Sequence, residues 1–158
     1  MIKLPKDLEY IITDFDGVIT DNYIYISNSN EHTMRLNFRD IMAISIAIKN
    51  GYKVGIISGE ASAAVDYVKD KFHLEEVHTN IRKKIDVLKD IIKRHNLDPK
   101  KIVYIGDDVN DIENLNFVGY PITVQNWIKA IKDIPNIQIT ETNGGNAAFR
   151  EIVDAIVG

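Results

Sequence analysis

Segments typical of β-strands alternate along this chain with segments whose apolar residues recur at helical spacing. The strand-like segments lie at residues 9–15, 52–59, 101–108, 119–124 and 137–140. The helix-like segments lie at residues 40–51, 62–72, 82–97, 126–134 and 146–157. Strands and helices that alternate at this spacing form βαβ units. The sequence therefore predicts an α/β fold with a Rossmann-like, mainly parallel sheet covered by helices on both faces.

Composition limits the domain organisation and the location of the protein. The 158 residues are 45% hydrophobic and 27% charged, without a linker-like or repetitive tract, so we expect one domain over residues 1–158. No apolar run approaches the roughly 18 residues of a membrane span, and residues 1–10 lack the apolar region of a signal peptide. We therefore expect a cytoplasmic protein.

Charge and residue types exclude several kinds of site. The chain has no cysteine, which excludes disulfides and thiolate metal sites, and its four histidines lack the spacing of zinc ligands. A net charge of −4 argues against nucleic acid or an anionic membrane as the main partner. An anionic small molecule stays possible if local cations or a metal ion offset the acidic balance.

Residues 22–38 interrupt the alternation with two β-like runs around the polar turn SNSNE, a pattern that predicts a β-hairpin. The hairpin follows the first strand, at the carboxyl edge of the sheet, where open α/β folds bind ligands. We expect either a flap over the site or a surface hairpin that covers a sheet edge or pairs with a neighbouring subunit. The two interpretations are compatible.

Polar residues follow three of the predicted strands and should meet at one edge of the sheet. They are Asp14, Asp16, Ser58, Asp107, Asp108 and Asp111. A lone aspartate at a strand end is usually a helix cap or a turn residue, but capping does not explain five carboxylates from two strand ends. Carboxylates this close raise one another's pKa, and a hard cation such as Mg²⁺, which prefers oxygen ligands, removes the repulsion. The sequence therefore predicts a magnesium site.

Four motifs in order resemble those of the haloacid dehalogenase superfamily of phosphotransferases. DFDGVIT resembles its first motif, IISG its second and IGDDVND its acidic fourth. Lys84, between the second and fourth, stands where the family places its phosphate-binding lysine. The resemblance spans residues 11–111 and implies phosphoryl transfer, which needs cations and hydrogen-bond donors around the transferred group.

The resemblance implies a role for each matching residue. Asp14 would be the covalent nucleophile that forms an aspartyl-phosphate, and Asp16 would be the general acid and base. Asp14, the carbonyl of Asp16 and Asp107 would hold Mg²⁺, while Ser58 and Lys84 would bind the phosphate.

Other residues near these motifs have less certain roles. Lys83 is a rival for Lys84, and the segment IRKK at residues 81–84 also fits a solvated helix start. Asp108 and Asp111 would orient the metal-binding loop without binding the ion directly. Arg150 is either a solvated helix residue or, as the sugar-acid branch of the family implies, a residue near the substrate carboxylate.

The short segments between the motifs leave no room for the cap domain that many relatives carry. The hairpin and the tail NGGNAAFREIVDAI resemble the capless sugar-acid branch, which comprises 3-deoxy-D-manno-octulosonate 8-phosphate phosphatases and 2-keto-3-deoxy-nonulosonate 9-phosphate phosphatases. That resemblance implies a phosphorylated sugar acid as substrate, and a homotetramer whose interfaces complete the sites.

Departures from the branch pattern bear on specificity. Asn22 and Ala147 stand where the branch usually has glycine, and Glu60 stands where octulosonate phosphatases usually have arginine. The nonulosonate phosphatases resemble this chain in having glutamate there, with a later lysine matched by Lys71. On one helix, Glu60 and Lys71 would share a face about 16 Å apart along the axis. A nine-carbon sugar acid is shorter than this separation. We therefore expect Glu60 to face its own subunit's substrate, and Lys71 to reach a neighbouring subunit's site and pair with the sugar carboxylate there.

Two other classes of protein fit parts of the pattern. A receiver domain also clusters carboxylates, binds Mg²⁺ and forms an aspartyl-phosphate, but the DxD motif and the lysine before GDD argue against it. A non-catalytic oligomerisation module, associated with a sugar-activating enzyme, is disfavoured because every catalytic position is filled.

Overall fold

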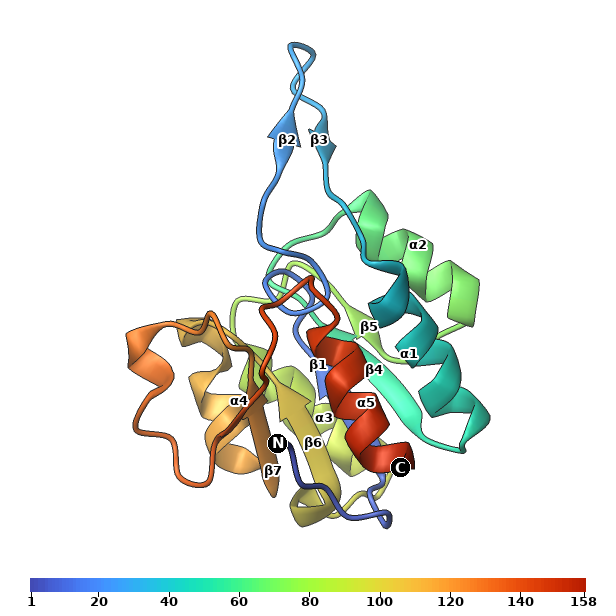
Figure 1. Ribbon diagram of the computed structural model, residues 1–158, viewed down its shortest axis with the longest axis vertical. Coiled ribbons are helices and arrows are strands. Elements are labelled where there is room, and N and C mark those ends of the chain that lie inside the picture. Colours follow the sequence, from blue (N-terminus) through green and yellow to red (C-terminus); the bar gives the residue numbers. More distant parts are fainter.

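The computed structural model describes all 158 residues and is built on one six-stranded sheet. The order is β5-β4-β1-β6-β7-β8, and every neighbouring pair is parallel. The strands are β1 (Tyr10–Thr13), β4 (Lys53–Ile57), β5 (Val77–His78), β6 (Ile102–Ile105), β7 (Tyr120–Thr123) and β8 (Gln138–Ile139). The predicted α/β fold is confirmed (Figure 1).

Helices cover both faces of the sheet. One face packs against α1 (Phe38–Lys49), α2 (Ala63–Phe72) and α5 (Ala148–Val157), the other against α3 (Lys84–Arg94) and α4 (Ile112–Phe117). Side chains of a strand alternate between faces. In β1, Ile11 accordingly belongs to the core under α1 and α5, whereas Tyr10 and Ile12 belong to the core under α3. None of the helices could span a membrane.

One predicted helix is wrong. Residues 126–134 form turns with a single 3₁₀ segment, η3 (Lys129–Ile131), in place of a helix. Pro135 disfavours helical backbone at the residue before it, which leaves this apolar segment too short for a stable helix. Ile131 and Ile134 of this segment are nevertheless buried in the core on the face of the sheet that α3 covers. The short helix α4 was not expected from the sequence.

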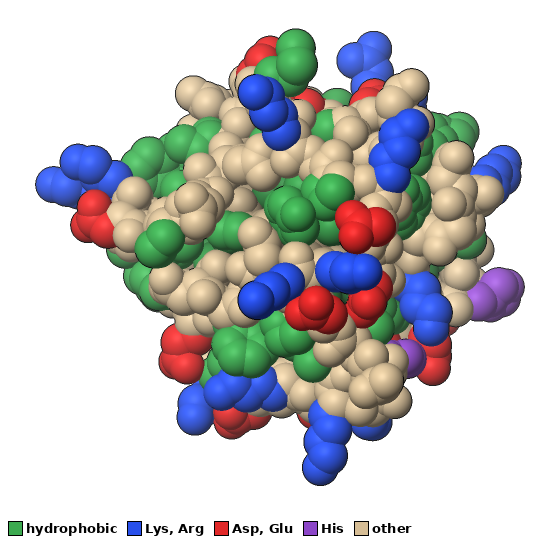
Figure 2. All heavy atoms as spheres, turned by 90° about the horizontal axis from the view of Figure 1, so that it is seen from below, with side chains coloured by type: hydrophobic (Ala, Val, Ile, Leu, Met, Phe, Trp, Pro, Cys, Tyr) green, Lys and Arg blue, Asp and Glu red, His purple; other side chains and the backbone are tan.

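The predicted hairpin is present and projects away from the body of the molecule (Figure 1). Its strands β2 (Tyr25–Ile26) and β3 (His32–Thr33) pair antiparallel. An ion pair between Arg35 and Asp21 closes its base. The opposite end of the molecule shows acidic and basic side chains interspersed (Figure 2).

Candidate active site

The predicted carboxylates meet where the strand order of the sheet reverses. From β1 the chain continues to β4 and β5 on one side of the sheet, whereas β6, β7 and β8 lie on the other. Ligands of open α/β sheets bind in the crevice at such a reversal, outside the carboxyl ends of the strands. Asp14 directly follows β1 and Asp107 lies just after β6. The Asp14 amide donates a hydrogen bond to the Ile105 carbonyl at 2.8 Å, which joins the two strand ends.

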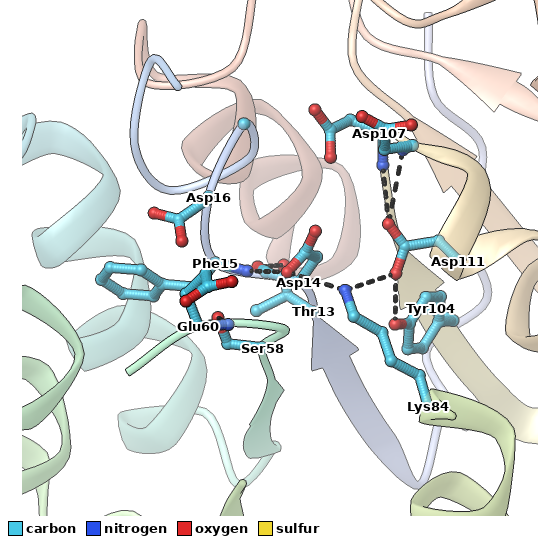
Figure 3. Close-up of polar contacts among 12 residues, drawn as sticks. Thr13, Asp14, Phe15, Asp16, Ser58, Glu60, Lys84, Tyr104, Asp107 and Asp111 are labelled. Atoms are coloured by element: carbon cyan, nitrogen blue, oxygen red, sulfur yellow. Dashed lines mark hydrogen bonds and ion pairs between the residues drawn. The ribbon is translucent and has the colours of Figure 1, made fainter. Parts of the chain in front are cut away.

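A buried lysine links the carboxylates from the two strands (Figure 3). The Lys84 side chain is fully buried, and its Nζ lies 2.9 Å from Oδ1 of Asp14 and 2.9 Å from Oδ1 of Asp111. The Tyr104 hydroxyl donates a further hydrogen bond to Asp111 Oδ1 at 2.7 Å. Lys83 instead points outward and pairs with Asp86 at 3.5 Å. Of the two lysine candidates, Lys84 is the one at the site.

The buried side chain of Asp111 holds the loop after β6 together by hydrogen bonds. Its Oδ2 accepts hydrogen bonds from the amides of Asp107 at 3.2 Å and Asp108 at 3.4 Å, while Oδ1 bonds to Lys84 and Tyr104. Both of its oxygens are thus occupied by groups of the chain. This arrangement holds the backbone of Asp107 in place.

Burial and crowding change the pKa values of the charged groups. Burial, reinforced by Asp111, raises the pKa of Asp14 well above its usual range. Burial, with Asp111 and Asp108, raises the pKa of Asp107 to about 7. Burial alone would lower the pKa of Lys84, but Asp111 and Asp14 outweigh it and raise this pKa. The site therefore contains more carboxylates than the chain supplies positively charged side chains to neutralise.

This donor set fits a hard divalent cation. Carboxylate oxygens of Asp14, Asp107 and Asp111 lie within 4.8 Å of one another, and all three residues are buried. Asp111 is already fully hydrogen-bonded, which leaves Asp14 and Asp107 with oxygens free to bind an ion. Oxygen ligands of this kind suit Mg²⁺, and a bound cation would offset the repulsion that adds to burial in raising the two pKa values.

The loop after β1 places a second carboxylate beside this group. Asp16 accepts a hydrogen bond from the Thr20 hydroxyl at 3.3 Å, and burial raises its pKa. Gly17 has φ +85°, and a Cβ at this position would overlap the carboxylate of Asp107. Glycine is therefore required here both for the backbone conformation and for the approach of Asp107.

The site opens into a cavity of about 240 Å³. Its lining comprises Asp14, Asp16, Asn22, Gly59, Glu60, Ile81, Arg82, Asp107, Asp108 and Asn110. A second hollow of about 300 Å³ lies at the base of the hairpin and shares Asp16, Asn22 and Glu60 with the first. The hairpin base thus extends the space available to a ligand.

Ser58 and Glu60 lie on the loop after β4. Ser58 is fully buried, and its hydroxyl accepts a hydrogen bond from the Glu60 amide at 3.3 Å. Figure 3 shows both near Asp14 and Asp16. Glu60 lines both hollows.

The expected helical relation between Glu60 and Lys71 is wrong. Ser62 is the N-cap of α2, accepting a hydrogen bond from the Val65 amide, so the helix begins only at Ala63. Glu60 precedes this cap, and the two residues share no helix face. Lys71 lies near the rings of Tyr67 and Phe72 and does not line either hollow.

Arg150 lies on α5, away from the cavity that contains Asp14. Its Nε donates to Asp154 at 2.7 Å, and it borders another hollow with Arg39 and Glu151. This placement resembles the solvated helix arginine, the simpler of the two interpretations of its sequence context.

The tail packs on the loop after β1. A Cβ at Gly144 would overlap the carbonyl of Gly17, and a Cβ at Gly145 would overlap the backbone of Thr20 and Asp21. Asn22 and Ala147 have φ values of 69° and 70°, so both adopt the left-handed backbone expected of glycine at these positions.

Several residues of this region were not identified from the sequence. Buried Asp40 accepts hydrogen bonds from the amides of Ala147 and Arg150, both at 3.0 Å, and so holds the start of α5. Arg82 and Asn110 line the cavity, and Tyr104 bonds to Asp111. Only Tyr104 offered a signal, as a polar-tipped residue inside an apolar strand.

These features define a hydrolase of the haloacid dehalogenase type. Residues 61–152 match the family of haloacid dehalogenase-like hydrolases, more than half of the chain, and the chain belongs to that family. This confirms the resemblance to the haloacid dehalogenase superfamily that the four motifs indicate. Relatives that match nearly the whole chain include phosphatases, and the chain is a phosphatase of this family.

Particular relatives extend the likeness to the residues before 61. The 3-deoxy-D-manno-octulosonate 8-phosphate phosphatase of Escherichia coli (strain K12) is 26% identical over 99% of this chain and 83% of its own length. The structure of the corresponding phosphatase from Yersinia pestis has a TM-score of 0.90 at 25% identity, covering 96% of this chain and 82% of that one. The Moraxella catarrhalis enzyme, in complex with a magnesium ion, a phosphate ion and KDO, has a TM-score of 0.90 at 25% identity, covering 96% and 87%.

Proposed function

We propose that the chain is a Mg²⁺-dependent phosphomonoesterase that acts on a phosphorylated sugar acid, a nonulosonate 9-phosphate or an octulosonate 8-phosphate. The observation that carries the proposal is the pair Asp14 and Asp107, which line a cavity where the strand order reverses, with the buried Lys84 at 2.9 Å from Asp14. The relatives that act on octulosonate 8-phosphate support the substrate class.

Two residues would carry out the chemistry. An Asp14 oxygen attacks phosphorus, the bond from phosphorus to the ester oxygen breaks, and Asp16 donates a proton to the leaving alkoxide. Asp16 then takes a proton from water, the water oxygen attacks phosphorus, and the bond to Asp14 breaks. The raised pKa of Asp16 suits the first step, because it favours the protonated acid.

Other groups would stabilise the transferred phosphoryl. Lys84 offers a positive charge next to Asp14, and Ser58 offers a hydroxyl. Mg²⁺, held by Asp14, the Asp16 carbonyl and Asp107, would offset the negative charge of the phosphoryl and of the carboxylates. Asp108 and Asp111 would orient this loop, a role that the hydrogen bonds of Asp111 support.

A homotetramer is part of the proposal. Tyr23, Ile24, Tyr25 and Ile26 on the hairpin are 46–71% exposed, and consecutive exposed apolar side chains are typical of an interface. Such an assembly could bring Lys71 or Arg150 of one copy towards another copy's site. Tyr25→Ser with Ile26→Ser should yield smaller species by light scattering, and an unchanged mass would contradict this interface. The cytoplasmic location stays a prediction.

The test is a screen of phosphorylated sugar acids with Mg²⁺, read as released phosphate. Asp14→Asn should retain the fold and lose at least about three decades of rate, because it removes the nucleophile. Near-normal turnover by a folded Asp14→Asn variant would contradict the mechanism. Glu60→Arg should shift preference from nonulosonate towards octulosonate phosphate, since it exchanges an anion for a cation in the cavity.

A further inference from the structure

The cavity beside Asp14 has a very uneven charge. Five of its lining residues are acidic, namely Asp14, Asp16, Glu60, Asp107 and Asp108, whereas Arg82 is its only lysine or arginine. The adjoining hollow at the hairpin base adds His32 but no lysine or arginine. A substrate with a carboxylate as well as a phosphate therefore meets a single fixed positive charge on the cavity walls.

Arg82 is free to bind a ligand. It is exposed, and its side chain takes part in none of the ion pairs or hydrogen bonds of the chain. Its neighbours differ from it, because Lys84 is buried between Asp14 and Asp111 and Lys83 pairs with Asp86 outside the cavity. Of these three consecutive basic residues, only Arg82 presents an unpaired charge to the cavity.

The position of Arg82 suits the end of the substrate that is remote from phosphorus. The phosphoryl must reach Asp14, which is only 5% exposed and already lies against Lys84. Arg82 is on the exposed loop between β5 and α3, which is fixed to the end of β4 by a 3.1 Å hydrogen bond from the Ile81 amide to the Ser58 carbonyl. A phosphomonoester bound at Asp14 would extend towards this outer part of the cavity.

We propose that Arg82 is a specificity-determining residue that binds the carboxylate of the sugar acid within the same subunit. This inference rests on the proposed function and names the group that the site recognises. A guanidinium can form two parallel hydrogen bonds with a carboxylate, which fixes its orientation as well as its charge. All the other charged residues that line the cavity are acidic and would repel a carboxylate.

The test compares two substrates with the purified full-length protein and Mg²⁺. One is the phosphorylated sugar acid that the screen identifies, and the other is 4-nitrophenyl phosphate, which has no carboxylate. Arg82→Met should raise KM for the sugar-acid phosphate about tenfold or more, equivalent to about 1.4 kcal/mol of binding. Its kcat for that substrate, and its kcat/KM for 4-nitrophenyl phosphate, should stay within about twofold of wild type.

Two variants serve as controls. Arg82→Lys keeps the charge but not the paired donors, so its KM should fall between those of wild type and Arg82→Met. Lys83→Met removes an exposed positive charge one residue away and should leave both substrates unaffected. Because Arg82 is exposed and unpaired, and Lys83 is exposed and only paired at the surface with Asp86, all three variants should fold, as a thermal melt will check.

Three results would overturn the inference. An unchanged KM in Arg82→Met would leave the arginine solvated, and equal losses on both substrates would place it on the phosphate. A selective rise in KM in Lys71→Ala, but not in Arg82→Met, would assign the carboxylate to a neighbouring subunit. Failure of the wild-type protein to hydrolyse any sugar-acid phosphate would refute the proposed function itself, and the inference with it.

Discussion

Two places with buried carboxylates differ in how completely the chain neutralises them: Glu76, and the ends of β1 and β6. Glu76, next to the edge strand β5, accepts hydrogen bonds from Arg94 at 2.5 and 2.9 Å, from His78 at 2.6 Å and from His95 at 2.7 Å. Arg94, with the two histidines, outweighs burial and lowers the pKa of Glu76 to about 2. This carboxylate is fully satisfied by its own chain.

The group at the ends of β1 and β6 is not satisfied in this way. Asp14 and Asp111 share one lysine, and Asp107 has no ion pair at all. The pKa of Asp107 is raised to about 7, the opposite direction from Glu76. Buried charge that the chain leaves uncompensated is expected where a ligand completes the site. The contrast therefore indicates that Glu76 and its partners have a structural role, whereas the aspartates at the ends of β1 and β6 have a functional one. Each prediction below tests this difference.

The largest expected effect is on activity. Asp107→Ala removes a carboxylate with oxygens free for the cation and should lower Mg²⁺-dependent turnover by about three decades or more. Asp108→Ala is the matched control and should lower it less, because outer groups tune a metal site more weakly than its ligands. Phosphate release titrated with Mg²⁺ measures both. A greater rise in the Mg²⁺ requirement from Asp111→Asn than from Asp107→Ala would reverse the assignment.

The second effect is on stability alone. Glu76→Ala should lower the free energy of unfolding by about 2–3 kcal/mol, because Arg94, His78 and His95 lose their common partner. Exposed Glu75 provides the control, and Glu75→Ala should change stability by no more than about 0.5 kcal/mol. Urea unfolding measures both variants. A large loss of kcat in folded Glu76→Ala would contradict the structural role of this group.

The two groups should give stability opposite dependences on pH. Asp107 binds protons more tightly in the folded state, so its contribution falls as pH rises from about 4 to about 7. Glu76 binds protons less tightly in the folded state, so its contribution falls as pH drops from 4.5 to about 2. Metal-free protein should thus be most stable near pH 4–5, as urea unfolding across pH will show.

Substitutions and added Mg²⁺ test separately how stability changes with pH below and above pH 5. Asp107→Asn should make the profile above pH 5 less steep, while Asp14, whose pKa is also raised, retains part of the slope. Glu76→Ala should flatten the profile below pH 5. Mg²⁺ should stabilise the protein more at pH 8 than at pH 5, because protons compete for the same oxygens. A metal-free protein whose stability rises steadily from pH 5 to pH 8 would contradict the uncompensated character of the Asp107 group.

The smallest effect concerns the tail that packs on the active-site loop. Ala147 has φ 70°, which costs an L-residue with a Cβ about 1 kcal/mol or more. Ala147→Gly should raise the free energy of unfolding by about 0.5–1 kcal/mol, after the entropy of the unfolded glycine is subtracted. Asn22→Gly should gain less, because asparagine tolerates this backbone better. Thermal melts of the two variants make the comparison, and a less stable Ala147→Gly would contradict it.

The sequence predicted the parts of the fold and site that depend on strand ends. Asp14 and Asp107 could be placed together because parallel strands deliver their carboxyl ends to one edge of the sheet. The choice of Lys84 over Lys83 relied on motif spacing, and the structure places Lys84 at the site. Asp14 as nucleophile and Asp107 as metal ligand stay predictions.

Features set by tertiary contacts could not be predicted. The Ser62 cap excludes Glu60 from α2, and a capping residue cannot be distinguished from a first-turn residue by periodicity alone. The four hydrogen bonds of Asp111 come from Lys84, Tyr104 and two amides, which only the folded chain brings together. Arg82 lines the cavity because of a loop path that no local pattern encodes.

The central claim is that Asp14, one of the buried aspartates at the ends of β1 and β6, forms an aspartyl-phosphate during the reaction. Borohydride reduces an acyl phosphate to the alcohol, so quenching the enzyme during turnover and mapping its peptides by mass spectrometry locates the intermediate as homoserine. The Asp16→Asn variant with an aryl phosphate should accumulate the intermediate, because that leaving group needs no proton and the base for its hydrolysis is missing. The account predicts homoserine at position 14, dependent on substrate and more abundant in Asp16→Asn. Reduction at another carboxylate, or none during measurable turnover, would contradict it.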